Sequence, residues 1–266
     1  MIGAAIAEFD RRQPLLTRFG LLLLGLSLVT AALQGIDPRL FMGQPVWAKP
    51  TRFFLSVGVF ALTAAWFVGD VRDDARDGRL LRWTAGALVV TGSYEVFYIA
   101  YRAALGQASH FNFDTPWTSL GYALMGIGAV VLVATALPIA WGVWHRPRPG
   151  LSPHYRLAVM LGRVLTVALG GVLGGYMSAQ GAHDVGVRGG TLAVTGWNRT
   201  GGDLRVAHFL GLHASQILPI AAIAIGATMT RGRRWAVAGV AALLTAATLA
   251  TFVQAVTGQP FLPSIG

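Results

Sequence analysis

The stretch Gly201–Gln216 (GGDLRVAHFLGLHASQ) decides how this chain folds, because it opens an apolar segment that continues as Ile217–Ala227 (ILPIAAIAIGA). Two glycines and an aspartate come first. An arginine, two histidines and a glutamine follow within the next helical turns. The whole segment is long enough to cross the hydrocarbon core of a bilayer, which takes about 20 residues. Ionisable residues are costly at such a place, so their presence indicates function.

The composition indicates an integral membrane protein. Of the 266 residues, 54% are hydrophobic and only 12% are charged, whereas soluble domains carry about 25% charged residues. The net charge of +10 sits in short basic clusters between apolar runs. That is the pattern of a membrane protein and not of a nucleic-acid-binding surface, so no nucleic acid is expected as a partner. The absence of cysteine excludes disulfides, thiolate metal sites and cysteine nucleophiles.

Seven apolar runs predict an all-α fold, a single transmembrane domain of residues 1–266 with a long outer loop at about 180–205. A cleaved signal peptide is the competing interpretation of the first run. The arginine and lysine bias of the loops favours a cytoplasmic N-terminus and an extracytoplasmic C-terminus. The predicted spans are about 19–36, 51–71, 83–105, 117–144, 156–179, 206–229 and 235–257.

The sixth predicted span carries the densest polar group. His208 and His213 are five residues apart, so they project about 140° apart around a helix and do not share a face. Arg205 shares a face with His208, and His213 shares one with Gln216. In the structural interpretation Asp203 caps the helix, Arg205 reaches the interface and the histidines bond neighbouring backbones. In the functional interpretation at least one histidine is a ligand or a proton carrier.

The third predicted span carries Glu95 and Arg102, which are seven residues apart and therefore lie on one face. Glu95 follows Arg82 by about 13 residues, hence ~20 Å along a helix, in the outer half of the membrane. A carboxylate there must be paired, protonated or metal-bound. An ion pair with an arginine of a neighbouring helix is the structural alternative to a ligand, a proton carrier or a substrate contact.

Four of the six histidines fall on the predicted outer face. They are His110 in the connection after the third span, His183 in the long loop, and His208 and His213. The only lysine, Lys49, lies with Arg52 at the outer start of the second span. There they serve either as an interfacial anchor or as an anion-binding group. Four glycines of the fifth span predict close helix packing: Gly170, Gly171, Gly174 and Gly175.

Three phrases of the sequence together resemble an uncharacterised family of bacterial polytopic membrane proteins. They are Lys49–Phe53 (KPTRF), Ser109–Asn112 (SHFN) and Gly202–Gln216 (GDLRVAHFLGLHASQ). The resemblance covers most of the chain. It implies a multi-pass protein of the bacterial plasma (inner) membrane and implies no activity.

The leading functional hypothesis is a histidine and glutamate site near the extracytoplasmic face that binds a transition metal (Zn, Fe or Cu) or haem. Such a metalloenzyme would be an oxidoreductase or a hydrolase acting on a lipid-soluble substrate. The predicted metal ligands are His110, His183, His208, His213 and Glu95. The predicted catalytic residues are Glu95, Arg102 and Arg205. Residues predicted to bind a cofactor or an anionic group are Lys49, Arg52 and Gln216.

Two other function classes stay open. One is a proton-coupled transporter or channel that uses Glu95 and the histidines as proton carriers. The other is a non-catalytic sensor or assembly factor. The expected partners are the lipid bilayer and a lipid-soluble or small-molecule substrate, with homo-oligomerisation left open. The site hypothesis depends on helices three and six converging on one cavity.

Overall fold

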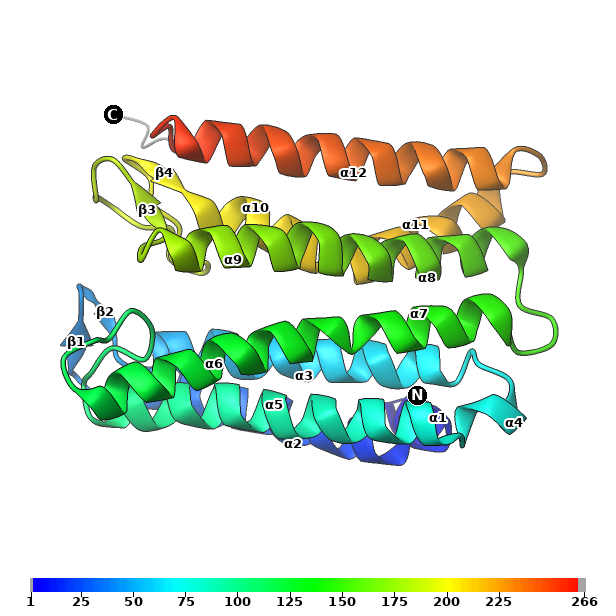
Figure 1. The fold of residues 1–266 in the computed structure, drawn as a ribbon, viewed down its shortest axis with the longest axis horizontal. Helices are drawn as coiled ribbons and strands as arrows, with labels where there is room; N and C mark the ends of the chain where they lie inside the picture. The colour runs from blue at the N-terminus through cyan, green and yellow to red at the C-terminus, as the bar shows by residue number, and fades with distance from the viewer. Residues whose placement is uncertain (1, 263–266) are drawn as a thin grey trace. The chain divides into compact units, whose positions relative to one another are not determined.

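The computed structural model describes residues 2–262, and it is helical apart from two hairpins of two-residue strands (Figure 1). Five helices in this part of the chain are long and apolar enough to cross a membrane: Pro14–Ile36, Ala48–Val68, Pro116–His145, Pro153–Ala179 and Arg233–Val256. A sixth candidate is the pair Leu204–Leu212 and Ala214–Thr228, bent by 52°, if the pair forms one span. The all-α, polytopic membrane class is therefore confirmed.

The predicted span at 83–105 is a helix of 26 residues, Arg79–Ala104, but it is not one of these candidate spans. Its polar residues, Glu95 and Arg102 among them, lower its mean hydropathy below that of the other long helices. The other predicted spans each match a candidate, and the structure begins most of them two to five residues earlier. The chain divides into two compact units, residues 1–142 and 143–266.

The first unit holds most of the helices and one hairpin. Its elements are α1 (Ile2–Arg12), α2 (Pro14–Ile36), β1 (Leu40–Phe41), β2 (Gln44–Pro45), α3 (Ala48–Val68), α4 (Asp73–Arg76), α5 (Arg79–Ala104), α6 (Pro116–Ala134) and α7 (Ala136–His145), whose last three residues lie beyond the unit. Helix α2 begins where Pro14 follows Gln13, whose side-chain oxygen accepts a hydrogen bond from the backbone N–H of Leu16. Helix α6 begins with a capping box between Thr115 and Thr118.

Close backbone approach joins the helices of the first unit. A Cβ on Gly20 of α2 would lie 3.0 Å from the carbonyl oxygen of Gly58 in α3. Small residues allow such contacts between helices in lipid. At the other end of α3, the buried Arg12 donates to Asp70 at 2.9 Å and to the carbonyl oxygen of Trp66 at 2.8 Å. This ion pair ties α1 to the end of α3.

The second unit consists of three long helical segments and one hairpin. Its elements are α8 (Pro153–Leu165), the π-helical turn η1 (Thr166–Gly171), α9 (Val172–Ala179), β3 (Asp184–Val185), β4 (Gly202–Asp203), α10 (Leu204–Leu212), α11 (Ala214–Thr228) and α12 (Arg233–Val256). Helices α8, η1 and α9 follow one another without a break, whereas α10 and α11 are separated at His213. Pro219, inside α11, removes one backbone donor close to that bend.

Glycines set the distance between the η1 region and α10. A Cβ on Gly211 would lie 2.7 Å from the backbone nitrogen of Gly170, and one on Gly174 would lie 2.7 Å from the ring of His208. Gly171 and Gly175 have nothing within 4 Å of the same position. The predicted packing role is thus confirmed for Gly170 and Gly174 and is wrong for Gly171 and Gly175, which lie on the other side of the helix.

Candidate functional site

Glu95, His110 and Lys49 lie together in the first unit, although they come from three separate elements. Glu95 is in the second half of α5, His110 is in the connection to α6, and Lys49 is in the first turn of α3. The Nε2 atom of His110 is 3.6 Å from Oε1 of Glu95. Its Nδ1 atom is 3.1 Å from Nζ of Lys49. Three of the predicted site residues therefore form one cluster.

The surroundings of His110 fix its ring. The hydroxyl of Ser109 lies 3.2 Å from Nδ1. The rings of Phe53 and Tyr122 pack against the imidazole with centroids 5.8 and 5.9 Å away. Phe111, the next residue, has φ +55°, in the left-handed region that a bulky side chain rarely adopts. Such backbone strain persists only where the surrounding structure holds it, and it concentrates at functional sites.

The position of the proton on His110 follows from the chemistry of its neighbours. An ammonium group can only donate hydrogen bonds, so Nδ1 of His110 accepts from Lys49 and the ring proton of neutral His110 is on Nε2. That proton faces the carboxylate of Glu95. Glu95 is buried, and its Oε2 atom has no hydrogen-bond partner within residues 2–262. A buried carboxylate with an open oxygen next to an imidazole can accept and release a proton.

Arg102 and Arg52 donate hydrogen bonds to backbone carbonyl oxygens near this cluster. Arg102 donates to the carbonyl oxygen of Ala108 at 3.3 Å, and no ion pair joins Glu95 to an arginine in the described part of the chain. Arg52 donates to the carbonyl oxygen of Ala48 at 3.0 Å and to the side chain of Gln44 at 2.6 Å. The arginine partner expected for Glu95 in the structural alternative is therefore replaced by His110.

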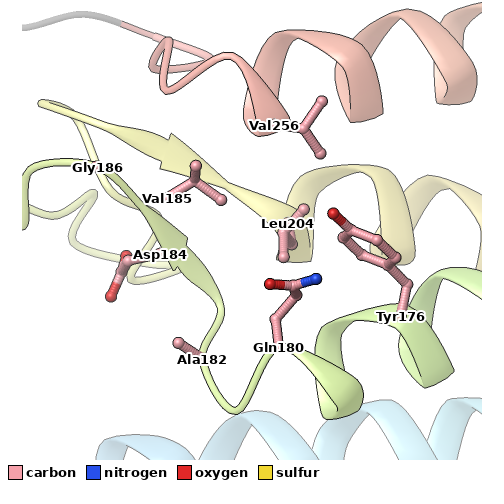
Figure 2. A pocket seen from close by; sticks show the side chains of 8 residues that line it. All are labelled: Tyr176, Gln180, Ala182, Asp184, Val185, Gly186, Leu204 and Val256. Atoms are coloured by element: carbon pink, nitrogen blue, oxygen red, sulfur yellow. The ribbon is translucent and has the colours of Figure 1, made fainter.

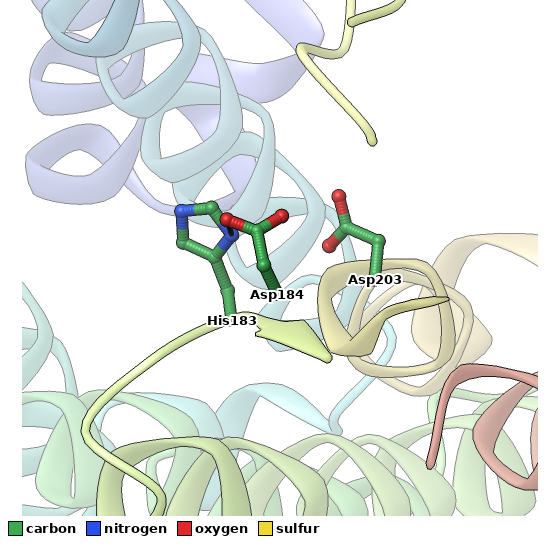
Figure 3. A group of neighbouring side chains, drawn as sticks. All are labelled: His183, Asp184 and Asp203. Atoms are coloured by element: carbon green, nitrogen blue, oxygen red, sulfur yellow. Dashed lines mark ion pairs between the residues drawn. The ribbon is translucent and has the colours of Figure 1, made fainter. Parts of the chain in front are cut away.

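His183, Asp184 and Asp203 form a second group, in the second unit (Figure 3). One ligand atom from each residue lies within 4.8 Å of the others. The Nδ1 atom of His183 is 3.2 Å from Oδ2 of Asp184. One imidazole and two carboxylates at this spacing are a ligand set for a divalent transition metal.

The two carboxylates already accept hydrogen bonds from the protein. Asp203 accepts from the backbone N–H of Asn198 at 2.8 Å, and from the backbone N–H and the guanidinium of Arg205. Asp184 accepts from the amide of Asn198 at 3.1 Å and lies 3.2 Å from Nε of Arg188. The predicted cap of the sixth span by Asp203 is confirmed. These five residues, with His183, tie the outer loop to the start of α10, and we name them the loop clamp.

The charge balance of the loop clamp lowers the pKa of Asp184. Burial alone would raise this pKa. The close approach of His183, the charge of Arg205 and the hydrogen bond from Asn198 together outweigh burial, so the carboxylate form is favoured. The Arg205 guanidinium also donates to the carbonyl oxygen of Gly196 at 2.6 Å. Arg205 thus belongs to the loop clamp, and its guanidinium joins Asp203 to the backbone of the loop at Gly196.

A cavity of about 390 Å³ lies beside the loop clamp (Figure 2). The hydroxyl of Tyr176 and the amide of Gln180 point into the space between α9 and the start of α10 in this view. The remaining wall is mostly apolar or backbone. The residues that line it are Tyr176, Gln180, Ala182, Asp184, Val185, Gly186, Leu204 and Val256.

His208 and His213 point to different surroundings in the second unit, as their spacing predicts. Nδ1 of His208 is 2.9 Å from the carbonyl oxygen of Gly170 in the π-helical turn. His213 lies at the break between α10 and α11, hydrogen-bonds Gln216, and packs its ring 4.1 Å from that of Phe209. His208 therefore bonds a neighbouring backbone, as the structural interpretation expects. Metal ligation by either histidine stays a prediction.

The predicted site residues divide between the two units. Glu95, His110 and Lys49 are in the first, and His183, His208 and His213 are in the second. Sequence reasoning missed Asp184 and Asn198 of the loop clamp, although an aspartate directly after His183 was a visible signal. No protein-family model, curated protein or solved structure matches the chain, so the resemblance to a bacterial family identifies no family.

Proposed function

We propose that this protein is a seven-span protein of the bacterial plasma membrane in which Glu95 and His110 carry protons for a transporter or channel. The N-terminus is in the cytoplasm and the C-terminus is outside. Helix α5, with 26 residues, supplies the seventh span. At 1.5 Å per residue it is about 39 Å long, more than the ~30 Å of a hydrocarbon core. It packs along α3 and α6, which belong to candidate spans.

The observation that carries this proposal is the contact of buried Glu95 with His110, whose other nitrogen faces Lys49. Protonation of His110 would place two like charges side by side, because Lys49 is only 3.1 Å away. This repulsion disfavours an imidazolium, so the transfer that fits is a coupled one: Nδ1 takes an ammonium proton from Lys49 while the Nε2 proton passes to Glu95, which leaves a neutral amine, a neutral imidazole and a neutral acid. A buried acid that gains and loses a proton next to a polar connection is the arrangement expected of a proton carrier in a membrane.

Proton flux across liposomes tests the proposal directly. Purified protein is reconstituted with a pH-sensitive dye inside, and a pH gradient is imposed. We expect E95Q and H110Q to reduce the protein-dependent flux by at least about tenfold, a loss equivalent to ~1.4 kcal/mol. The matched control is H145Q, because His145 is an exposed histidine at the end of α7. Flux in E95Q equal to that of the unsubstituted protein contradicts the proposal.

The loop clamp supports a second candidate function, binding of a transition metal. Its support is the spacing of His183, Asp184 and Asp203, and a metal there would permit redox or hydrolytic chemistry on a lipid-soluble substrate. The competing hydrogen bonds of both carboxylates count against it. Elemental analysis and an absorption spectrum of detergent-purified protein test it, for haem as well as for a bare metal ion. Stoichiometric metal that H183A abolishes supports this candidate, and a colourless, metal-free protein removes it.

A further inference from the structure

An open depression of about 580 Å³ lies on the surface of the first two turns of α5. It is lined by Arg79, Arg82, Trp83 and Gly86, all from this one helix. Both arginines are exposed, and the side chain of Trp83 is 78% exposed. Gly86 has nothing within 4 Å of the position where a Cβ would be. The surface is therefore an open notch with two cations and an indole at its edge.

The two arginines of the notch differ from the arginines just before them. Arg72 pairs with Asp74, and Arg76 pairs with Asp73 and Asp77. Arg79 and Arg82 make no ion pair and no side-chain hydrogen bond within residues 2–262. The three aspartates of the connection are thus paired with two arginines, which leaves one net negative charge there, whereas the two arginines of the notch have no acidic partner in the part of the chain that the structure describes.

An apolar stripe continues from the notch along α5. Val90 is 69% exposed and Phe97 is 47% exposed, and each lies seven residues after the one before, counting from Trp83. Residues seven apart share a helix face, so Trp83, Val90 and Phe97 form one strip about 21 Å long. A strip of this length is longer than the hydrocarbon thickness of one leaflet, which is about half of a ~30 Å core. An indole is the side chain typical of the boundary between hydrocarbon and headgroups.

We propose that the notch binds the headgroup phosphate of an anionic phospholipid, whose acyl chain lies along the stripe. Two unpaired guanidiniums suit a phosphate, which they can bind with paired N–H donors. The apolar stripe directly after them suits the acyl chain and is not needed for a free anion. Charge complementarity therefore selects an anionic lipid over a zwitterionic one. The stripe is exposed whereas Glu95 on the same helix is buried, so the lipid would lie on a different face of α5 from the proposed proton transfer.

Lipid binding to the full chain in detergent tests this inference. Native mass spectrometry counts bound phosphatidylglycerol and phosphatidylcholine on the unsubstituted protein and on R79Q/R82Q. We expect phosphatidylglycerol to be preferred over phosphatidylcholine. We expect the double substitution to weaken phosphatidylglycerol binding by about tenfold to thirtyfold, since two cations near a membrane surface together contribute a factor of that size. The matched control is R146Q/R148Q, which removes the same charge from exposed arginines of the connection between α7 and α8.

A second variant keeps the charge and fills the notch. G86L places a side chain in the open space beside Arg82 and Trp83, and we expect it to weaken phosphatidylglycerol binding without lowering the melting temperature of the lipid-free protein. Equal losses in R79Q/R82Q and R146Q/R148Q would show that net charge alone attracts the lipid and would overturn the site. Equal binding of both lipids would do the same. Competition by millimolar inorganic phosphate would identify a free-anion site in place of a lipid site.

Discussion

The hydroxyl of Thr166 donates a hydrogen bond to the carbonyl oxygen of Leu212 at 3.1 Å, across the break between α10 and α11. The same hydroxyl accepts from the backbone N–H of Ser215 at 3.1 Å. A broken helix leaves backbone groups without partners in its own helix, and in hydrocarbon each costs several kcal/mol. One side chain from the start of the π-helical turn therefore satisfies both sides of the break.

We expect T166V to lower the free energy of unfolding by about 1–3 kcal/mol, because it leaves a buried donor and a buried acceptor unsatisfied. T166S retains the hydroxyl and should stay within about 1 kcal/mol of the unsubstituted protein. The matched control is T245V, since Thr245 bonds only a carbonyl of its own helix. Thermal denaturation in detergent measures all three. If T166V and T245V had the same melting temperature, the proposed role of the Thr166 hydroxyl in bridging the break would be excluded.

Glycine substitutions on the facing helices should have opposite signs. Ala at Gly211 would meet the backbone nitrogen of Gly170 at 2.7 Å, so we expect G211A to destabilise the protein by about 1–3 kcal/mol. Ala at Gly175 meets nothing within 4 Å, so G175A should stabilise it by about 0.5–1 kcal/mol through helix propensity alone. The measurement is the change in melting temperature in one detergent. Two shifts of the same sign would disprove the packing of α10 on the η1 region.

The sequence predicted the long helices well, because apolar runs bounded by charged loops leave few alternatives. It did not predict the π-helical turn or the break at His213. Both depend on what the opposite helix presents, here Thr166 facing Leu212 and Gly174 leaving room for His208. Such features come from tertiary contacts, and the local pattern of the fifth and sixth spans is that of ordinary apolar helices.

Acidification should loosen the loop clamp. The pKa of Asp184 is lower in the folded protein than its ordinary value, so its contribution to stability is present above about pH 4 and is lost as the pH falls through the lowered pKa. We expect D184N to lower the melting temperature at pH 5 and above, through loss of about 1–3 kcal/mol. Below pH 4 the difference from the unsubstituted protein should shrink. The control is D74N, an exposed ion pair that should have little effect at any pH.

A melting-temperature difference for D184N that stayed constant down to pH 3 would show that the carboxylate charge does not hold the loop. Hydrogen exchange in the segment 184–205 gives an independent measure. It should rise in D184N at neutral pH if the clamp orders that segment, and it should be unchanged in D74N.

The candidate site could be predicted from sequence only in part. Glu95 stood out because an ionisable side chain in an apolar run is expensive, and His110 because it lies on the same predicted outer face as three other histidines. Their grouping depended on loop conformation. The contact between Lys49 and His110 joins residues 61 positions apart and is fixed by the turn at Phe111, and no periodicity encodes either. Arg102 and Arg205 stood out for the same reason as Glu95, and the structure shows them bonding loop backbone.

The role of α5 determines on which sides of the membrane the termini lie, and this distinguishes seven spans from six. If α5 crosses together with the bent pair α10–α11, the termini lie on opposite sides; if it does not cross, they lie on the same side. We expect α5 to cross, because its buried Glu95 and Arg102 face other helices and its exposed Trp83, Val90 and Phe97 form an apolar outer strip.

Fusions of alkaline phosphatase and of a fluorescent protein to each end test this, since the first is active only outside and the second fluoresces only in the cytoplasm. Fluorescence at the N-terminus and phosphatase activity at the C-terminus are expected. The same reporter active at both ends would mean that either α5 or the bent pair does not cross, and loss of α5 would remove the setting in which a proton on Glu95 could be carried across.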